Sequence, residues 1–161
     1  IIRRVRAMTT RSEVKTARVP VPECLREAVN LAVIGLDVTV AYDLEPKLYV
    51  DADRIQLQQV IINLIRNAVE AMEGQPEKRI EVTGRRTGEV VSLSIQDFGA
   101  GIDPEHLPTV FDSFMSTKPK GMGVGLAISR TIIESHGGRL TVQSTPGEGA
   151  TFTLTLPRWG S

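Results

Sequence analysis

The chain has 161 residues, the length of one typical globular domain, and its 19 basic and 19 acidic side chains leave no net charge. This balance gives no sign of nucleic-acid binding or of acidic disorder, and four Phe, two Tyr and one Trp offer little surface for base stacking. No apolar run is long enough to span a bilayer, and the first residues do not show the apolar stretch expected of a secretory leader. The single cysteine, Cys24, excludes an intrachain disulfide and is typical of a cytoplasmic domain.

Residues 1–18 differ from the rest of the chain, because they hold six basic residues and one acidic residue. Ile1, Ile2, Val5 and Met8 recur at helical spacing, which predicts the end of an amphipathic helix whose partner lies outside this chain. A solvated, frayed end is the alternative. Because the first residue is not methionine, we expect a segment of a longer protein, with a main domain over residues 19–157 and a tail over 158–161.

The remaining elements are predicted in chain order from periodicity, prolines and glycines. Residues 19–22 are expected to be extended, since each residue before a proline favours the β region. Next come a helix over 23–34, strands over 38–43 and 48–50, and a long helix that begins at residue 51 or 53 and ends at residue 72.

The second half of the chain continues with two predicted hairpins. Strands over 80–85 and 89–97 form the first hairpin, and strands over 139–145 and 149–156 form the second. Between them lie a mostly irregular region with one short helix after residue 104, and a helix over 123–136. The expected fold is α+β, a two-layer α/β sandwich with a mixed, mainly antiparallel sheet and helices on one face.

A row of polar side chains follows one face of the long helix. Its members recur at steps of three and four: Gln56, Gln59, Asn63, Asn67 and Glu70. Such a row is usually just a solvated face, but Glu or Lys would favour the helix more than asparagine does. Two asparagines one turn apart therefore suggest ligand contact, because amide oxygens can hold a hard cation and its phosphates without adding negative charge.

Asp97 ends a strand in which the apolar residues occupy odd positions, so its carboxylate is predicted to point into the core. A buried carboxylate needs hydrogen-bond donors. The backbone amides of Gly99 and Gly101 would provide them if Asp97 only caps a turn. Alternatively, Asp97 accepts from the exocyclic amine of a flat ring to which the glycines give access.

Residues 121–126 read Gly-Met-Gly-Val-Gly-Leu and open a predicted helix. Free amides at a helix start attract anions, and glycines let a phosphate approach the backbone. The pattern matches neither the dinucleotide fingerprint nor a P-loop. The preceding segment 113–120 carries two lysines and is interpreted as a mobile lid near the phosphates, with a plain surface loop as the alternative.

Taken together and in this order, these segments resemble the Bergerat-type nucleotide-binding domain shared by histidine kinases, gyrase, ninety-kilodalton heat-shock chaperones and mismatch-repair ATPases. Residues 63–71 resemble its N box, 97–102 and 121–126 its two glycine boxes, 111–114 its F box, and 146–152 its closing glycine hairpin. The F box and residues 134–138 are typical of sensor histidine kinases. Residues 67–72 and 116–119 are similar to the subgroup of oxygen-sensing and nitrogen-regulatory kinases.

The resemblance implies ATP and Mg²⁺ as ligands. Asn67 would ligate Mg²⁺, Asn63 would contact the phosphates or the metal, and Asp97 would accept from the adenine amino group. Hydrolytic relatives place a glutamate at the position of Asn63, so its absence favours transfer to a protein acceptor over hydrolysis. Phe98 and Ala150 depart from the residues that kinases commonly have there, which would lower nucleotide affinity.

The resemblance also implies contacts around the base and the phosphates. Gly101 and Ile102 would line the base, and Lys118 would assist the amides of Gly123 and Gly125 in positioning the phosphates. Five further residues complete the implied nucleotide site: Glu70, Gly99, Phe114, Gly121 and Leu126.

The resemblance implies a phosphoacceptor histidine on a separate dimerisation domain of the same protein, and a response regulator as the next acceptor. Residues 1–18 would be the end of the second dimerisation helix, the full-length protein a homodimer and this chain a monomer. His106 and His136 are both interpreted as structural, the latter as a partly protonated imidazole beside a Gly-Gly helix end. An anti-sigma-type serine/threonine kinase and a non-catalytic nucleotide-binding module are the alternative functions.

Overall fold

The computed structural model describes residues 15–111 and 122–160, together with the backbone but not the side chains of residues 122–124. The elements of the first half are β1 (Ala17–Pro20), α2 (Val21–Ala32), β2 (Thr39–Leu44), β3 (Tyr49–Ala52), α3 (Arg54–Ala71), β4 (Arg79–Thr87) and β5 (Val90–Asp97). The second half contains a short 3₁₀ helix (Leu107–Thr109), α4 (Met122–Ser135), β6 (Arg139–Ser144) and β7 (Ala150–Pro157).

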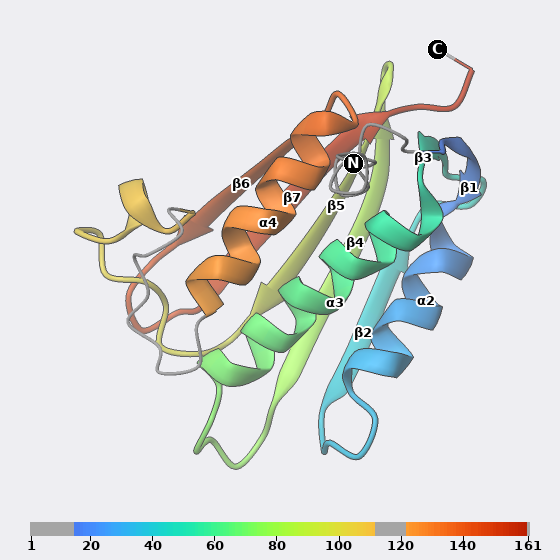
Figure 1. The fold of residues 1–161 in the computed structure, drawn as a ribbon. Helices are drawn as coiled ribbons and strands as arrows, with labels where there is room; N and C mark the ends of the chain where they lie inside the picture. The colour runs from blue at the N-terminus through green and yellow to red at the C-terminus, as the bar shows by residue number, and fades with distance from the viewer. Residues whose placement is uncertain (1–14, 112–121, 161) are drawn as a thin grey trace, which may run out of the picture.

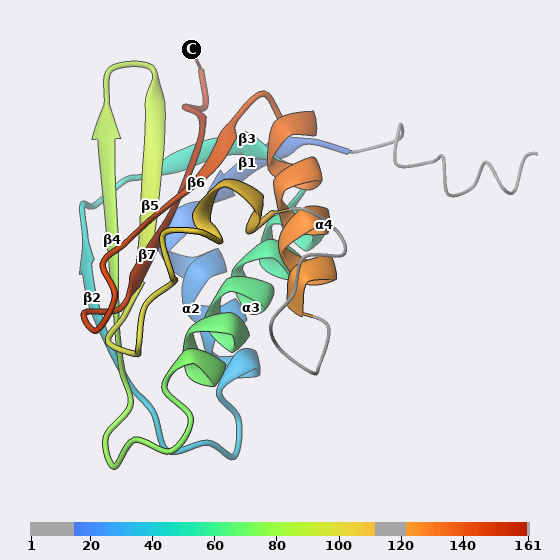
Figure 2. The ribbon, with the colours of Figure 1, turned by 90° about the vertical axis from the view of Figure 1, so that its left-hand side faces the viewer.

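The main sheet has five strands in the order β2-β4-β5-β7-β6. The β2–β4 pair is parallel and the three other pairs are antiparallel, which confirms the mixed, mainly antiparallel sheet. A separate two-stranded sheet pairs β1 with β3. Helices α2, α3 and α4 cover one face of the main sheet, and the other face carries none of the described helices (Figure 1; Figure 2). The expected two-layer α+β sandwich is therefore confirmed.

The core lies between the sheet and the helices, as the alternation along β5 illustrates. Val91, Leu93 and Ile95 are buried, whereas the intervening residues face the open side of the sheet. There the hydroxyl groups of Ser94 and Thr153 form a hydrogen bond of 3.0 Å. Strand periodicity thus places apolar side chains on the helix-covered face and hydroxyls on the open face.

The N-terminal part of the described chain differs from the prediction in two respects. Ala17 and Arg18 belong to β1 instead of a helix, because they pair with β3 and because Pro20 restricts the residue before it to extended backbone. The expected extended segment ends at residue 20, and Pro22 lies in the first turn of α2. Proline is tolerated there because the first amides of a helix need no intrahelical acceptor. The helix expected within residues 1–14 lies outside the described residues.

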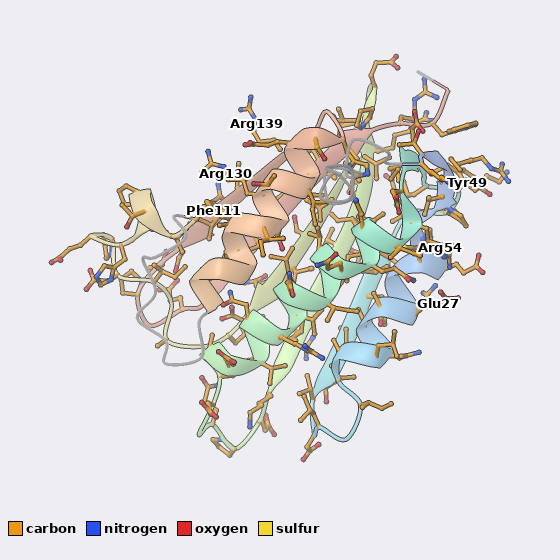
Figure 3. All side chains as sticks on the ribbon, in the orientation of Figure 1. Glu27, Tyr49, Arg54, Phe111, Arg130 and Arg139 are labelled. Carbon is orange, nitrogen blue, oxygen red and sulfur yellow. The ribbon has the colours of Figure 1, made fainter. Side chains whose placement is uncertain are left out.

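The start of α3 follows from its capping residue. Asp53 is the N-cap, and its Oδ1 accepts from the backbone amides of Ile55 at 3.0 Å and Gln56 at 3.2 Å. Arg54 forms an ion pair with Glu27 of α2 at 2.8 Å, between the two labelled side chains in Figure 3. None of the described helices is both long and apolar enough to cross a membrane.

Candidate functional site

The polar row on α3 lies partly inside the molecule. Asn67 is only 6% exposed, although asparagine usually lies at the surface, and Asn63 and Glu70 are half-buried. The side-chain amide of Asn67 makes no hydrogen bond to any other residue that the structure describes. A buried amide without a protein partner has hydrogen-bonding and ligating capacity left for a bound group.

Asp97 ends β5 and is 1% exposed, which confirms the predicted inward orientation. Its Oδ1 accepts from the backbone amide of Gly99 at 2.9 Å, as the sequence suggests, and from that of Ala150 at 3.3 Å. These bonds satisfy the requirement that a buried carboxylate have donors. A carboxylate can accept about four hydrogen bonds, so this geometry is compatible with a ligand amine as a further donor.

The loop that follows Asp97 is attached to the C-terminal end of α3. A side chain at Gly99 would overlap the backbone carbonyl of Ala71, so only glycine lets the loop approach this closely. Gln75, just beyond the helix, donates its Nε2 hydrogen to the carbonyl oxygen of Phe98 at 3.3 Å. The loop is therefore positioned at the end of the same helix that carries the polar row.

The same loop is also attached to the β6–β7 hairpin. The backbone amide of Ile102 donates to Oγ of Ser144 at 2.7 Å, and that hydroxyl donates to the carbonyl oxygen of Gly149 at 2.9 Å. Gly101 packs against the carbonyl of Thr145, and Ile102 is half-buried against the core. The amide of Gly147 donates to the carbonyl oxygen of Ala100 at 2.6 Å. Both sides of the glycine loop are thus held by hydrogen bonds.

Helix α4 contacts the polar row at Asn63. Gly123 lies in its first turn, and Gly125 lies so close to Asn63 that an added methyl group would be 3.8 Å from Cγ of that amide. The Nδ2 atom of Asn63 donates to Oγ of Ser129 at 3.2 Å. Leu126, expected at the nucleotide site, is a buried core residue of this helix. The glycine-rich start of α4 and the asparagine row therefore lie side by side.

The first residue of the predicted F box is anchored against α4 and the sheet. The Phe111 ring meets the Phe152 ring edge to face, with 6.1 Å between centroids. On α4, the Arg130 guanidinium carbon lies 5.3 Å from the Phe111 centroid, and Figure 3 labels both side chains beside that helix. Phe114, Lys118, Gly121 and the expected lid lie outside the described residues.

Helix α3 therefore connects two parts of the site that lie far apart in the sequence, α4 and the loop after Asp97. Asn63 contacts α4, and Ala71, eight residues further on, contacts the glycine loop of Asp97. Eight residues span about 12 Å of helix. The buried amide of Asn67 lies midway between these two contacts. An elongated ligand could use the carboxylate at one end and the helix start at the other.

The donor set of this region is suited to a cation held by amide and phosphate oxygens. Among residues 15–111 and 122–160, no group of three or more His, Cys, Asp or Glu side chains is arranged to hold a metal ion. A hard cation such as Mg²⁺ usually keeps several waters and binds through few protein oxygens together with substrate phosphates. The amide of Asn67, which makes no hydrogen bond to a described residue, fits such a cation.

The sequence does not single out Ser129 and Ser144, two residues of this site. The position of Ser129 in α4 could nevertheless have indicated its role. Ser129 interrupts the apolar stripe of α4 three residues after Leu126 and four before Ile133. A polar residue in such a stripe indicates a specific buried partner. Ser144 leaves no comparable signal, because its hydrogen bonds depend on how the hairpin meets the glycine loop.

Comparison with known proteins finds a match to one family model and to several sensor kinases. The family described as histidine kinase-, DNA gyrase B-, and HSP90-like ATPase matches residues 52–160. The sensor protein FixL of Bradyrhizobium diazoefficiens is 40% identical over 162 residues, covering 98% of this chain and 32% of that protein. The C4-dicarboxylate transport sensor protein DctS of Rhodobacter capsulatus is 39% identical, covering 98% of this chain and 25% of that protein.

Solved structures show the same fold. The catalytic domain of histidine kinase ThkA has a TM-score of 0.79 and 30% identity, and the match covers 89% of this chain and 96% of that one. Full-length ShkA in complex with AMPPNP has a TM-score of 0.78 and 27% identity, covering 90% of this chain and 31% of that one. Compared with the sensor proteins FixL and DctS, the present chain spans a third or less of their length.

Proposed function

Because this chain belongs to the histidine kinase-, DNA gyrase B- and HSP90-like ATPases, we propose that it binds ATP with Mg²⁺ and phosphorylates a histidine on a separate dimerisation domain. One observation carries the proposal. Along α3, a row of buried and half-buried amides connects the loop of the buried Asp97 with the glycine-rich start of α4. In this arrangement the Asp97 loop would hold the base of one nucleotide, and the start of α4 would hold its phosphates.

Asp97 recognises the base in this proposal. Its buried carboxylate accepts from the amino group of adenine, while Gly99 and Ala150 hold the acceptor in place through their backbone amides. Gly101 and Ile102 line the ring from the loop that hydrogen bonds attach to Ser144. A hydrogen bond made away from water discriminates well, because a ligand without the donor leaves the buried acceptor unpaired.

Asn67 and Asn63 hold Mg²⁺ and orient the phosphates. Their amide oxygens are neutral ligands, which do not repel the triphosphate as carboxylates would. When bound, Mg²⁺ neutralises charge on the phosphate oxygens. The amides of Gly123 and Gly125 at the start of α4 provide the N–H groups and the positive helix end that favour the same anion. Glu70, Phe114, Lys118, Gly121 and Leu126 remain predicted members of this site.

Transfer is favoured over hydrolysis because Asn63 offers no general base for an attacking water. In the transfer, the terminal P–O bond of ATP breaks, ADP leaves, and an N–P bond forms on the acceptor imidazole. His136 is unsuited as acceptor, because contacts with the protein occupy both of its ring nitrogens. The acceptor belongs to a dimerisation domain of the same protein, which forms a homodimer and passes the phosphoryl group to a response regulator.

The nucleotide site is tested by calorimetric titration of this chain with ATP in the presence and absence of Mg²⁺. We expect saturable binding that strengthens when Mg²⁺ is added. GTP, which carries an oxygen where adenine has the amino group, is the matched control and should bind more weakly. Equal affinities for ATP and GTP would contradict recognition by Asp97, and no binding at all would overturn the proposed function.

The transfer step is tested with ATP labelled at the terminal phosphate. We expect no label on this chain alone, and label on a two-helix dimerisation domain with its acceptor histidine when that domain is added in trans. The added domain brings an acceptor histidine close to the terminal phosphate of ATP, and transfer requires this proximity. The label should be lost in acid, as phosphohistidine is. Acid-stable label would identify a serine/threonine kinase instead, and ATP binding without any transfer would identify a non-catalytic module.

A further inference from the structure

Ser129 is a buried polar residue on the core-facing side of α4. It is 0% exposed and lies on α4 between Leu126 and Ile133, both of which belong to the core. Burying a hydroxyl group in such surroundings costs free energy unless the group is hydrogen-bonded. An alanine at this position would be the ordinary choice for a helix packed against another helix. The presence of a serine at this buried position therefore needs an explanation.

The hydrogen bond of Ser129 gives that reason. Nδ2 of Asn63 donates to Oγ of Ser129 at 3.2 Å, across the contact between α3 and α4. The two ends of an asparagine amide differ, since the nitrogen only donates and the oxygen only accepts. With its nitrogen directed to Ser129, Asn63 has its carbonyl oxygen at the opposite end of the amide.

Packing alone leaves this amide orientation unspecified. The neighbour of Asn63 on α4 is Gly125, where an added methyl group would lie 3.8 Å from Cγ and 3.9 Å from Nδ2. The nitrogen and oxygen of an amide have nearly the same size, so such contacts do not distinguish them. In the structure the atom that meets Oγ of Ser129 is Nδ2, and not Oδ1.

We propose that Ser129 is a positioning residue that turns the carbonyl oxygen of Asn63 toward the bound cation. This inference rests on the proposed function, in which Asn63 lies beside Mg²⁺ and the phosphates. Without Ser129, the amide would also adopt the flipped orientation, which presents N–H groups where the cation needs an oxygen. Ser129 thus acts on cation binding through Asn63 and makes no contact with the nucleotide itself.

The test compares ATP affinity with and without Mg²⁺ in the wild-type chain and in Ser129→Ala. We expect the variant to raise the Kd for ATP in the presence of Mg²⁺ by about threefold to tenfold, and to raise the Kd without Mg²⁺ less. Ser129→Thr keeps the hydroxyl and should restore the Mg²⁺ effect. Ser135→Ala is the matched control, because Ser135 lies on the same helix but is exposed and donates to the carbonyl oxygen of Ile132.

A second substitution shows whether the effect passes through Asn63. In an Asn63→Ala background there is no amide to orient, so we expect Ser129→Ala to change the affinity for ATP and Mg²⁺ no further. An equal loss of affinity with and without Mg²⁺, or an additive loss in the double variant, would overturn the positioning role. Ser129→Cys has a similar size and a weaker acceptor, and it replaces the alanine variant if thermal melting shows that alanine unfolds the chain.

The two proposals fail in different ways. If wild-type ATP binding does not respond to Mg²⁺, the cation role of the asparagine row is wrong, and the role of Ser129 is wrong with it. If wild-type binding responds to Mg²⁺ but Ser129→Ala leaves that response intact, only the role of Ser129 is overturned.

Discussion

The backbone amide of Asp53 donates to Nε2 of His136 at 3.1 Å, which connects the N-cap of α3 to the residue after α4. On the other side of the ring, Nδ1 lies 2.8 Å from the carbonyl oxygen of Ile132. A carbonyl oxygen cannot donate, so Nδ1 carries the hydrogen, and an amide N–H cannot accept, so Nε2 carries none. These two contacts therefore favour the tautomer that carries its hydrogen on Nδ1.

This geometry predicts one tautomer of His136. Long-range ¹H–¹⁵N spectra at neutral pH should show a protonated Nδ1 and an unprotonated Nε2, because both neighbouring backbone groups require it. His106 provides the comparison within the same spectrum, since its ring makes no hydrogen bond to a described residue. A protonated Nε2 on His136 would contradict the hydrogen bond from Asp53.

Replacing Asp97 by asparagine should weaken ATP binding while the fold persists. The asparagine oxygen can still accept from the amides of Gly99 and Ala150, but its nitrogen would face the adenine amino group with a second donor. We expect a loss of about 1–3 kcal/mol in binding free energy, measured by calorimetry. Asp103→Asn is the control, because that side chain is exposed and accepts from the nearby amide of Glu105. Unchanged affinity of Asp97→Asn would refute the assignment.

Local periodicity predicts those parts of the site that depend on single elements. The alternation before Asp97 places its carboxylate inside, and steps of three and four place Asn63 and Asn67 on one face of α3. These relationships follow from the geometry of one strand and one helix. The helix-covered sheet likewise follows from the order of the elements.

Contacts between segments that lie far apart in the sequence are harder to predict. Asn63 and Ser129 are 66 positions apart, and the amide of Ala150 reaches Asp97 across 53 positions. Which strands become neighbours is also undetermined locally, and the parallel β2–β4 pair is an example. Arg18 continues a basic, helix-like segment in the sequence, but pairing with β3 determines its conformation. Such outcomes depend on the packing of the whole domain.

The thiol of Cys24 should make stability fall at alkaline pH. Burial raises the pKa of Cys24 from 9.0 to about 11, while nearby Arg54 opposes that rise. Between these values the unfolded chain loses the thiol proton and the folded chain keeps it. The folded state then binds more protons, so its stabilisation is complete below about pH 9 and is lost as pH rises through about 11.

Denaturant unfolding from about pH 8 to about pH 11 measures this effect. Lysines and tyrosines titrate in the same range, so the informative quantity is the difference between the wild type and Cys24→Ala. The free energy of unfolding should fall more steeply with pH in the wild type than in the variant. Parallel pH profiles would show that the buried thiol does not contribute.

Two glycines of the β6–β7 hairpin allow the cost of a strained backbone to be measured separately from the cost of a close contact. Gly147 and Gly149 both have positive φ, 82° and 94° respectively, so alanine is strained at either position. An added methyl group at Gly147 meets nothing within 4 Å, whereas at Gly149 it would overlap the carbonyl oxygen of Asp97. The hairpin therefore contains its own matched control for the contact that places Asp97.

We expect Gly147→Ala to lower the free energy of unfolding by about 1–2 kcal/mol, which is the conformational cost alone. Gly149→Ala should cost more than about 3 kcal/mol, because the hairpin must also move away from the end of β5. That movement would displace the amide of Ala150 from the Asp97 carboxylate, so the variant should lose ATP affinity in addition to stability. Denaturant unfolding and calorimetric ATP titration measure the two effects. Equal losses in the two variants would mean that the contact between Gly149 and Asp97 does not position the carboxylate.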